Sequence, residues 1–268
     1  MLINTVILFI KDLMPIFVLL CLVSTCIAPN RISYIKLLYV FFASVVGIFA
    51  TFYFLPVMGE LFDGIGIEVI KTFELVFVYF CLLIGCSSLL TKNTIAALQS
   101  NLIIVGLVIF TVINASEFIV FLDSYLANSQ SIRDVVAGLS IGLGICLSFS
   151  ALVYFSLHWF IKKELFTLLY IVWALFLSGQ ISQVVNLLQQ VDMIKSSAAL
   201  WDSSNLVKDS SEYGHLLKTL FGYEASPSLE FIMLYAASLL LFIVTFFIKS
   251  QRKVKNKCDR AKENENVV

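Results

Sequence analysis

Apolar stretches of nearly constant length recur along the whole chain of 268 residues. About 20 residues, at ~1.5 Å rise each, let an α-helix cross the ~30 Å hydrocarbon core of a bilayer. Backbone polar groups in lipid must be satisfied within helices or closed barrels, and runs this long exclude barrel strands. The composition, 60% hydrophobic and 13% charged, agrees with a membrane protein. We therefore predict an all-α, polytopic membrane protein with seven transmembrane helices, at about 3–27, 37–57, 65–90, 102–125, 135–160, 165–188 and 229–248.

Basic residues gather on one side of these predicted helices, and Lys and Arg normally stay on the cytoplasmic side. They follow the first, third, fifth and seventh helices, as Arg31, Lys36, Lys92, Lys162, Lys163 and the basic residues of 249–262. The pattern predicts a protein of the cytoplasmic (plasma) membrane with the N-terminus outside. The division is a transmembrane domain at 1–248, with an external loop at about 191–228, and a disordered basic cytoplasmic tail at 249–268. Such a tail is a topology anchor rather than a nucleic-acid site.

The first helix carries adjacent opposite charges, Lys11 and Asp12, followed by Pro15. Proline removes a backbone hydrogen bond and favours a kink. Charged groups beside a broken helix near the membrane midplane are typical of transporter sites. The alternative is a buried ion pair that only fixes helix packing.

The fourth helix carries Asn114 and Glu117 inside an apolar run. An intramembrane carboxylate is costly in lipid, so by default it faces the protein interior or an aqueous path. The alternative is that Glu117 merely hydrogen-bonds a neighbouring helix. Glu117 and Asp12 lie at similar depth on helices that run in opposite directions. This arrangement predicts an inverted repeat of two three-helix units, followed by a seventh helix, with the site at the repeat interface.

The start of the third helix is rich in charge: Glu60, Asp63, Glu68, Lys71 and Glu74. On one continuous helix, all of these except Glu68 share about a quarter of the circumference. One interpretation is an acidic vestibule with Glu60 and Asp63 at its entrance. The other is an external amphipathic turn in which Lys71 is neutralised by Glu68 and Glu74, three residues away on either side.

The fifth and sixth helices carry small and amide side chains. Gly138 and Gly142 have the small-xxx-small spacing that lets two helices approach closely, which predicts a packing seam. Gln180 and Gln183 belong to a series of polar residues in the sixth helix. Such amides either line a polar path or bond to neighbouring helices. We favour the path, with both glutamines as supporting residues.

A distinctive order of features follows in the last third of the chain: Gly179-Gln180, Leu187-Leu188-Gln189-Gln190, Leu200-Trp201-Asp202, Ser211-Glu212-Tyr213-Gly214-His215 and Leu220-Phe221-Gly222-Tyr223. Together with Gly59 to Gly64 and with the segment from Val136 to Phe166, this order resembles the high-affinity iron permeases of the Ftr and EfeU type. The resemblance covers most of the chain and is strongest over about 135–248. It implies a seven-helix permease domain at 1–248.

The resemblance also implies iron uptake through Arg-Glu-x-x-Glu motifs on the first and fourth helices. Here these motifs are degenerate, because Asp12 and Glu117 are the two acids that remain. Carboxylates are suitable ligands for a hard cation such as ferric iron. We therefore expect a transporter, not an enzyme, with Asp12, Glu117 and Asn114 as metal-handling residues and Lys11 supporting them. Iron is expected as substrate rather than as a resident cofactor.

The external segment from Trp201 to Tyr223 has two interpretations, a lid over the entrance or a docking surface. A docking surface implies an external partner such as a ferroxidase or an iron-binding protein. The alternative function follows from it. In that case the chain is a non-transporting or other-metal family member that acts as a membrane subunit through its external loop. No feature of the sequence points to nucleic acid as a partner.

Overall fold

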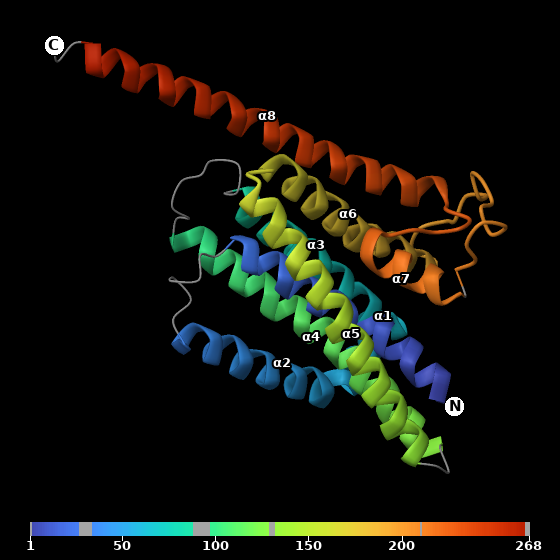
Figure 1. The fold of residues 1–268 in the computed structure, drawn as a ribbon. Coiled ribbons are helices and arrows are strands. Elements are labelled where there is room, and N and C mark those ends of the chain that lie inside the picture. Colours follow the sequence, from blue (N-terminus) through green and yellow to red (C-terminus); the bar gives the residue numbers. More distant parts are fainter. Residues whose placement is uncertain (1, 27–33, 88–96, 129–131, 210, 266–268) are drawn as a thin grey trace.

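The computed structural model describes residues 2–26, 34–87, 97–128, 132–209 and 211–265. The described chain is helical, with irregular segments between the helices (Figure 1). The elements are α1 (Leu2–Cys26), α2 (Tyr34–Glu60), the 3₁₀ turn η2 (Leu61–Gly64), α3 (Gly66–Cys86), α4 (Ala97–Asn128), α5 (Ile132–Lys162), α6 (Phe166–Gln190), α7 (Glu212–Phe221) and α8 (Leu229–Glu265).

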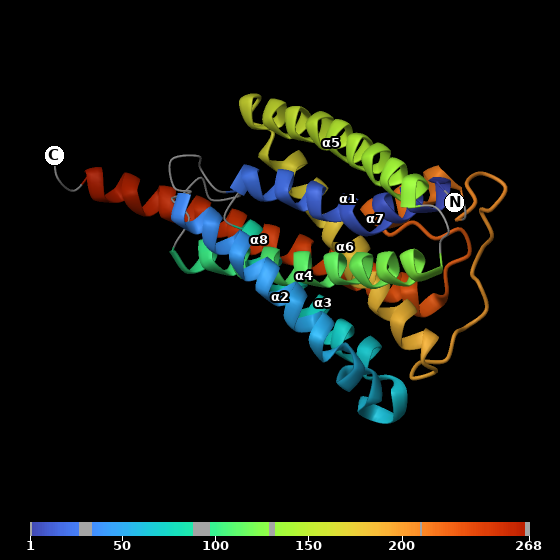
Figure 2. The same cartoon turned by 90° about the horizontal axis from the view of Figure 1, so that it is seen from below.

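Seven of the described helices are long and apolar enough to cross a membrane, which confirms the predicted all-α architecture. The short helix α7 is not among them. The N-terminus and the 191–228 segment lie at one end of the bundle, and the C-terminal end of α8 lies at the other (Figures 1 and 2). Lys162 and Lys163 are exposed where α5 meets α6. Arg31 and Lys92 lie outside the described residues, and the orientation that the basic residues predict stays a prediction.

The tail differs from the sequence prediction. The backbone of α8 continues as a helix to Glu265 (Figure 1), through the basic segment for which we expected disorder. The predicted boundary between 248 and 249 therefore falls inside one helix. Only the part from Leu229 to Ile248 qualifies as a membrane span.

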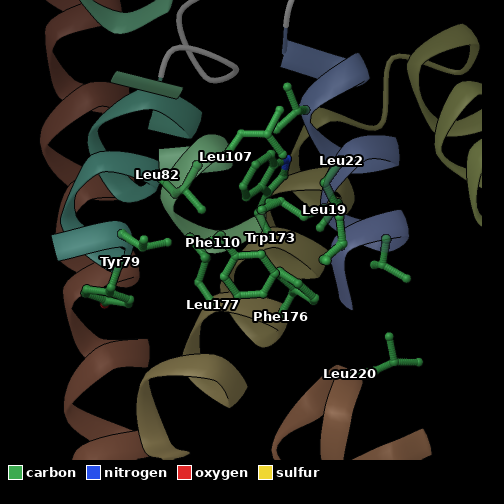
Figure 3. Close-up of a cluster of buried hydrophobic side chains, with 14 of the residues drawn as sticks. Leu19, Leu22, Tyr79, Leu82, Leu107, Phe110, Trp173, Phe176, Leu177 and Leu220 are labelled. Atoms are coloured by element: carbon green, nitrogen blue, oxygen red, sulfur yellow. The ribbon is translucent and has the colours of Figure 1, made fainter. Parts of the chain in front are cut away.

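Helix α6 runs through the middle of the bundle, and large side chains pack around it (Figure 3). Trp173 is fully buried, and the rings of Phe110 and Phe176 meet edge to face with their centroids 6.2 Å apart. Edge-to-face geometry is the arrangement that aromatic quadrupoles favour. This apolar core holds α1, α3 and α4 in fixed positions around α6.

Small residues allow the helices to approach closely. A Cβ atom added to Gly142 of α5 would lie 2.7 Å from the Cβ of Phe9 in α1, as the predicted packing seam requires. In the same way, a Cβ on Gly85 of α3 would lie 2.3 Å from Cγ1 of Ile103 in α4. Contacts this short leave no room for a larger residue, so these glycines set how closely α1 packs on α5 and α3 on α4.

Helices α2 and α5 lie on opposite flanks of the bundle (Figure 2). Helix α2 packs against α4 and α3, and α5 packs mainly against α1. In an inverted repeat the α1–α5 and α4–α2 contacts would be equivalent, and both pairs are in contact. The extensive α3–α4 contact has no comparably extensive α1–α6 counterpart among the described residues. The repeat stays a prediction.

The third span begins at Gly66, close to the predicted start at about 65, but Glu60 and Asp63 do not belong to its helix. Glu60 ends α2, and Asp63 lies in η2 with a left-handed backbone (φ 59°). Helix α3 starts only at Gly66. The idea that Glu60 and Asp63 share one helical face with Lys71 was therefore wrong, because a turn separates them.

Candidate functional site

A cavity of about 390 Å³ lies between α1, α2, α3 and α4, towards the end of the bundle that holds the N-terminus. Its wall carries no charged residue on α2, where Thr51, Leu55 and Met58 line it, and is mixed on the other three helices. The charged side chains that line the cavity are Lys11, Asp12, Lys71, Glu74 and Glu117. With all five ionised, two positive and three negative groups give a net charge of −1.

On α1, Asp12 is buried and its neighbour Lys11 is largely exposed, although both line the cavity. The Asp12 side chain is 5% exposed and that of Lys11 is 59% exposed, and Nζ lies 3.9 Å from Oδ1. This long contact to an exposed ammonium is a weak ion pair. Pro15 lies within α1 and has no N–H, so the Lys11 carbonyl does not receive the usual hydrogen bond from residue 15. A buried carboxylate thus lies beside a backbone carbonyl that lacks its normal helical donor.

Across the cavity, Lys71 of α3 and Glu117 of α4 form a short ion pair, with Nζ 2.8 Å from Oε1. One interpretation of Lys71 was neutralisation by Glu68 and Glu74 on its own helix. The structure pairs Lys71 with Glu117 instead, so Glu117 does bond a neighbouring helix, as one of its two interpretations expected. Both side chains are partly accessible, at 27% for Lys71 and 34% for Glu117. Asp12 interacts electrostatically with both of them.

The structure thus brings the two main predicted residues, Asp12 and Glu117, to one cavity. Asn114 does not belong to the cavity lining; its Nδ2 donates a hydrogen bond to the Phe110 carbonyl of the same helix, at 2.9 Å. Glu60 and Asp63 are exposed at the α2–η2 turn and also lie outside the lining.

Gln180 and Gln183 are likewise outside the cavity. Gln180 is buried, and its Nε2 donates to the Thr219 carbonyl at 2.6 Å. That carbonyl lies in the last turn of α7, where a helix leaves acceptors without intrahelical donors. Gln183 donates to Gln180 Oε1 over a long 3.5 Å. Gln180 thus bonds α7 to α6, Gln183 contacts Gln180 on the same helix, and neither amide lines the cavity.

The junction of α6 with α7 is closed by two glycines. A Cβ on Gly179 would lie 2.5 Å from the carbonyl carbon of Phe221. Gly222 adopts φ +68°, the left-handed conformation that glycine provides at a helix C-terminus. The Gly179-Gln180 and Phe221-Gly222 pairs, which stood out in the sequence, therefore contact each other.

The 191–228 segment around α7 is ordered by local hydrogen bonds. Ser211 caps α7 by accepting from the Gly214 amide at 3.0 Å. Tyr223 donates to the Val207 carbonyl at 3.0 Å and also bonds the Ser203 hydroxyl. Tyr223 is thus a structural residue of this segment and not a free docking residue.

His215 of α7 lies near Lys11 of α1. Burial lowers the pKa of His215 below its ordinary value of 6.5, and the positive charges of Lys11 and Lys218 lower it further. Asp209 acts in the opposite direction. Helix α7 is therefore coupled electrostatically to Lys11 of α1, beside the cavity.

Lys71 and Glu74 are the cavity residues that we did not assign to the site, although their charges inside an apolar run were visible in the sequence. What the sequence lacked was the pairing of α3 with α4. Among the described residues, no group of three or more His, Cys, Asp and Glu side chains is close enough to hold a metal ion. The cavity therefore offers separate carboxylates rather than a preformed cage.

Comparison with protein-family models, with curated proteins and with solved structures found no match to this chain.

Proposed function

We propose that this protein moves metal cations, iron first among them, across the cytoplasmic membrane through the cavity between α1 and α4. One observation carries the proposal: Asp12 of α1 and Glu117 of α4, about a hundred residues apart in the sequence, line the same cavity. Carboxylates at such depth are expensive unless they serve an interior or aqueous site. The proposal includes an N-terminus outside and a C-terminus in the cytoplasm.

The chemistry of the lining favours a hard cation. The cavity carries three carboxylates and a net charge of −1, and oxygen ligands suit hard metal ions. One water occupies ~30 Å³ of liquid, so about 390 Å³ leaves room for a cation with several waters. Because the carboxylates do not converge on one point, the ion would be held partly by water. Such loose coordination suits passage rather than storage.

The test is uptake of radiolabelled iron by cells that lack their own iron permeases. The intact protein is compared with the Asp12→Asn/Glu117→Gln double variant at equal membrane expression. We expect uptake by the intact protein and background uptake by the double variant, since both carboxylates of the proposed path are then neutral. Ferric and ferrous iron are supplied in separate assays.

The matched control is Asp123→Asn/Asp134→Asn. It removes two carboxylates, at the end of α4 and the start of α5, that do not line the cavity. Uptake by this control should equal that of the intact protein. If the intact protein takes up no iron, and manganese and zinc also fail, the transport proposal is wrong.

A second candidate function is supported by exposed apolar residues on the external segment. Leu206 is 86% exposed and Tyr213 is 76% exposed, and Trp201 is half-exposed. Exposed apolar residues of this kind favour a contact with an external partner, such as a ferroxidase or an iron-binding protein. If this function is the main one, Tyr213→Ser and Leu206→Ser abolish activity in the cell while Asp12→Asn and Glu117→Gln are tolerated.

A further inference from the structure

We propose that Lys71 is a tethered cation that competes with the transported metal ion for Glu117 and transfers to Glu74 when the metal arrives. This inference rests on the proposed cation transport and adds how the site selects its substrate. It starts from the ion pair, whose 2.8 Å contact places an ammonium where a cation bound to Glu117 would lie.

The pair is accessible enough to exchange. Lys71 is 27% exposed and Glu117 is 34% exposed, and both line the cavity. Breaking a fully buried ion pair is costly, because it leaves an uncompensated charge in the interior. A partly exposed pair is worth less and rearranges more readily. Glu117 is therefore paired with Lys71, but the pair can exchange for another cation.

Lys71 has a second acid within reach. Glu74 follows three residues later on α3, lines the same cavity and interacts electrostatically with Lys71. Residues at this spacing are neighbours on a helix surface. Glu68, three residues earlier, is not part of the lining. A metal ion that takes Glu117 thus leaves Lys71 with a carboxylate on its own helix, and no charge is left unpaired in the membrane.

Competition with a lysine selects by charge. Coulomb energy scales with the product of the charges, so a divalent or trivalent ion gains more from Glu117 than the ammonium loses. A monovalent ion carries the same charge as Lys71 and has no such advantage, and it lacks a tether that keeps it close. Lys71 would therefore exclude sodium and potassium while it yields to a metal ion.

The experiment measures equilibrium binding of radiolabelled ferrous iron, under anaerobic conditions, to the full chain in lipid nanodiscs. Lys71→Gln should lower the apparent Kd for iron by roughly threefold to tenfold, since a partly exposed competitor is removed. Sodium at 0.1 to 1 M, roughly the range that screens exposed charge pairs, should compete with iron in Lys71→Gln more than in the intact protein. Lys195→Gln, which removes an exposed external lysine, should change neither result.

Unchanged or weaker iron binding by Lys71→Gln overturns the competition, since Lys71 would then only position Glu117. If this variant does not fold, Lys71→Met replaces it, since methionine is also neutral and is unbranched like lysine. Failure of the intact protein and of both variants to bind or transport any metal instead overturns the proposed function. The two failures are thus distinguishable.

The transfer to Glu74 has its own test. Glu74→Gln should weaken iron binding when Lys71 is present, because the displaced ammonium loses its second partner. It should have no effect in the Lys71→Gln background. Weaker binding in both backgrounds would make Glu74 a direct metal ligand and would overturn the transfer.

Discussion

The cavity between α1 and α4 and the junction between α6 and α7 both use polar side chains within the bundle, but in different ways. At the junction, Gln180 donates to the Thr219 carbonyl, and Gly179 packs against the backbone of Phe221. Every polar group named there completes a helix end. At the cavity, Asp12 and Glu117 border open volume and contact ammonium groups that are partly exposed.

The difference teaches how to separate function from packing among intramembrane polar residues. A residue that donates a hydrogen bond to a buried acceptor between packed helices stabilises one arrangement of those helices. A charged residue that borders an accessible volume is costly to keep there and is free to exchange partners. The two regions should therefore respond in opposite ways when polar or small residues are changed.

The largest effect on stability is expected for Gly179→Ala. The new Cβ would lie 2.5 Å from the Phe221 carbonyl carbon and 2.6 Å from the Gly222 nitrogen, and neither backbone atom yields easily. We expect a loss of about 1–3 kcal/mol or more, as for an overpacked core. Thermal unfolding of the purified protein in detergent measures it.

Gly144→Ala is the matched control for this change. It adds the same Cβ to a helical glycine that has nothing within 4 Å, so the melting temperature should stay the same or rise slightly. Equal melting temperatures for the two variants would show that α7 is not docked closely on α6.

The next effect is expected for Gln180→Leu. Leucine leaves the Thr219 carbonyl without its 2.6 Å donor, and an unsatisfied buried acceptor costs about 1–3 kcal/mol. Protease cleavage within 191–228 should become faster because α7 opens more often. Gln183→Leu loses only a 3.5 Å contact and should have a smaller effect. A larger effect of Gln183→Leu would assign that residue a role outside this junction.

The sequence was sufficient for the spans and for pairing Asp12 with Glu117. Span length follows directly from bilayer thickness, and both acids line one cavity, as their similar distances from the ends of their helices predict. The sequence was not sufficient to predict in which direction around its helix each polar side chain points. Asn114 is one turn from Glu117, yet its amide bonds its own helix.

Partners across helices were also beyond the sequence. Lys71 has acids three residues away on its own helix, yet it pairs with Glu117 of α4. Helices α3 and α4 pack closely, as the contact of Gly85 with Ile103 shows. In the same way, the amides of the sixth helix were interpreted as a polar path because the partner of Gln180 was not visible in the sequence. That partner, the Thr219 carbonyl of α7, lies 39 residues later along the chain. Distant segments that meet in space determine both roles.

A small effect on stability, in contrast, is expected for Asp12→Asn. Its partner Lys11 is 3.9 Å away and exposed, so little attraction is lost, and neutralising a buried carboxylate removes a desolvation penalty. The melting temperature should stay within a few degrees of the wild type, or rise, while iron uptake falls. A loss of stability as large as that of Gly179→Ala would make Asp12 a packing residue, and the contrast between the two regions would fail.

The smallest effect is a pH dependence of α7 docking that comes from His215. Burial and the charges of Lys11 and Lys218 lower its pKa in the folded protein below 6.5, against the weaker effect of Asp209. Above pH 6.5 the imidazole is neutral in both states and the full stability is present. As the pH falls below 6.5, the unfolded state binds a proton first, so stability is lost down to the lower folded-state pKa.

Hydrogen exchange of the α7 amides between pH 7.5 and pH 5.5, corrected for the intrinsic exchange rate, measures this dependence. We expect protection to decrease toward pH 5.5 in the intact protein and to vary less in His215→Asn, which cannot bind the proton. His158→Asn, which changes the second of the two histidines, on α5, should keep the dependence. A dependence that persists in His215→Asn would assign the titration to another group. It would also remove the electrostatic link between the junction and the cavity, because that link requires His215 to respond to Lys11.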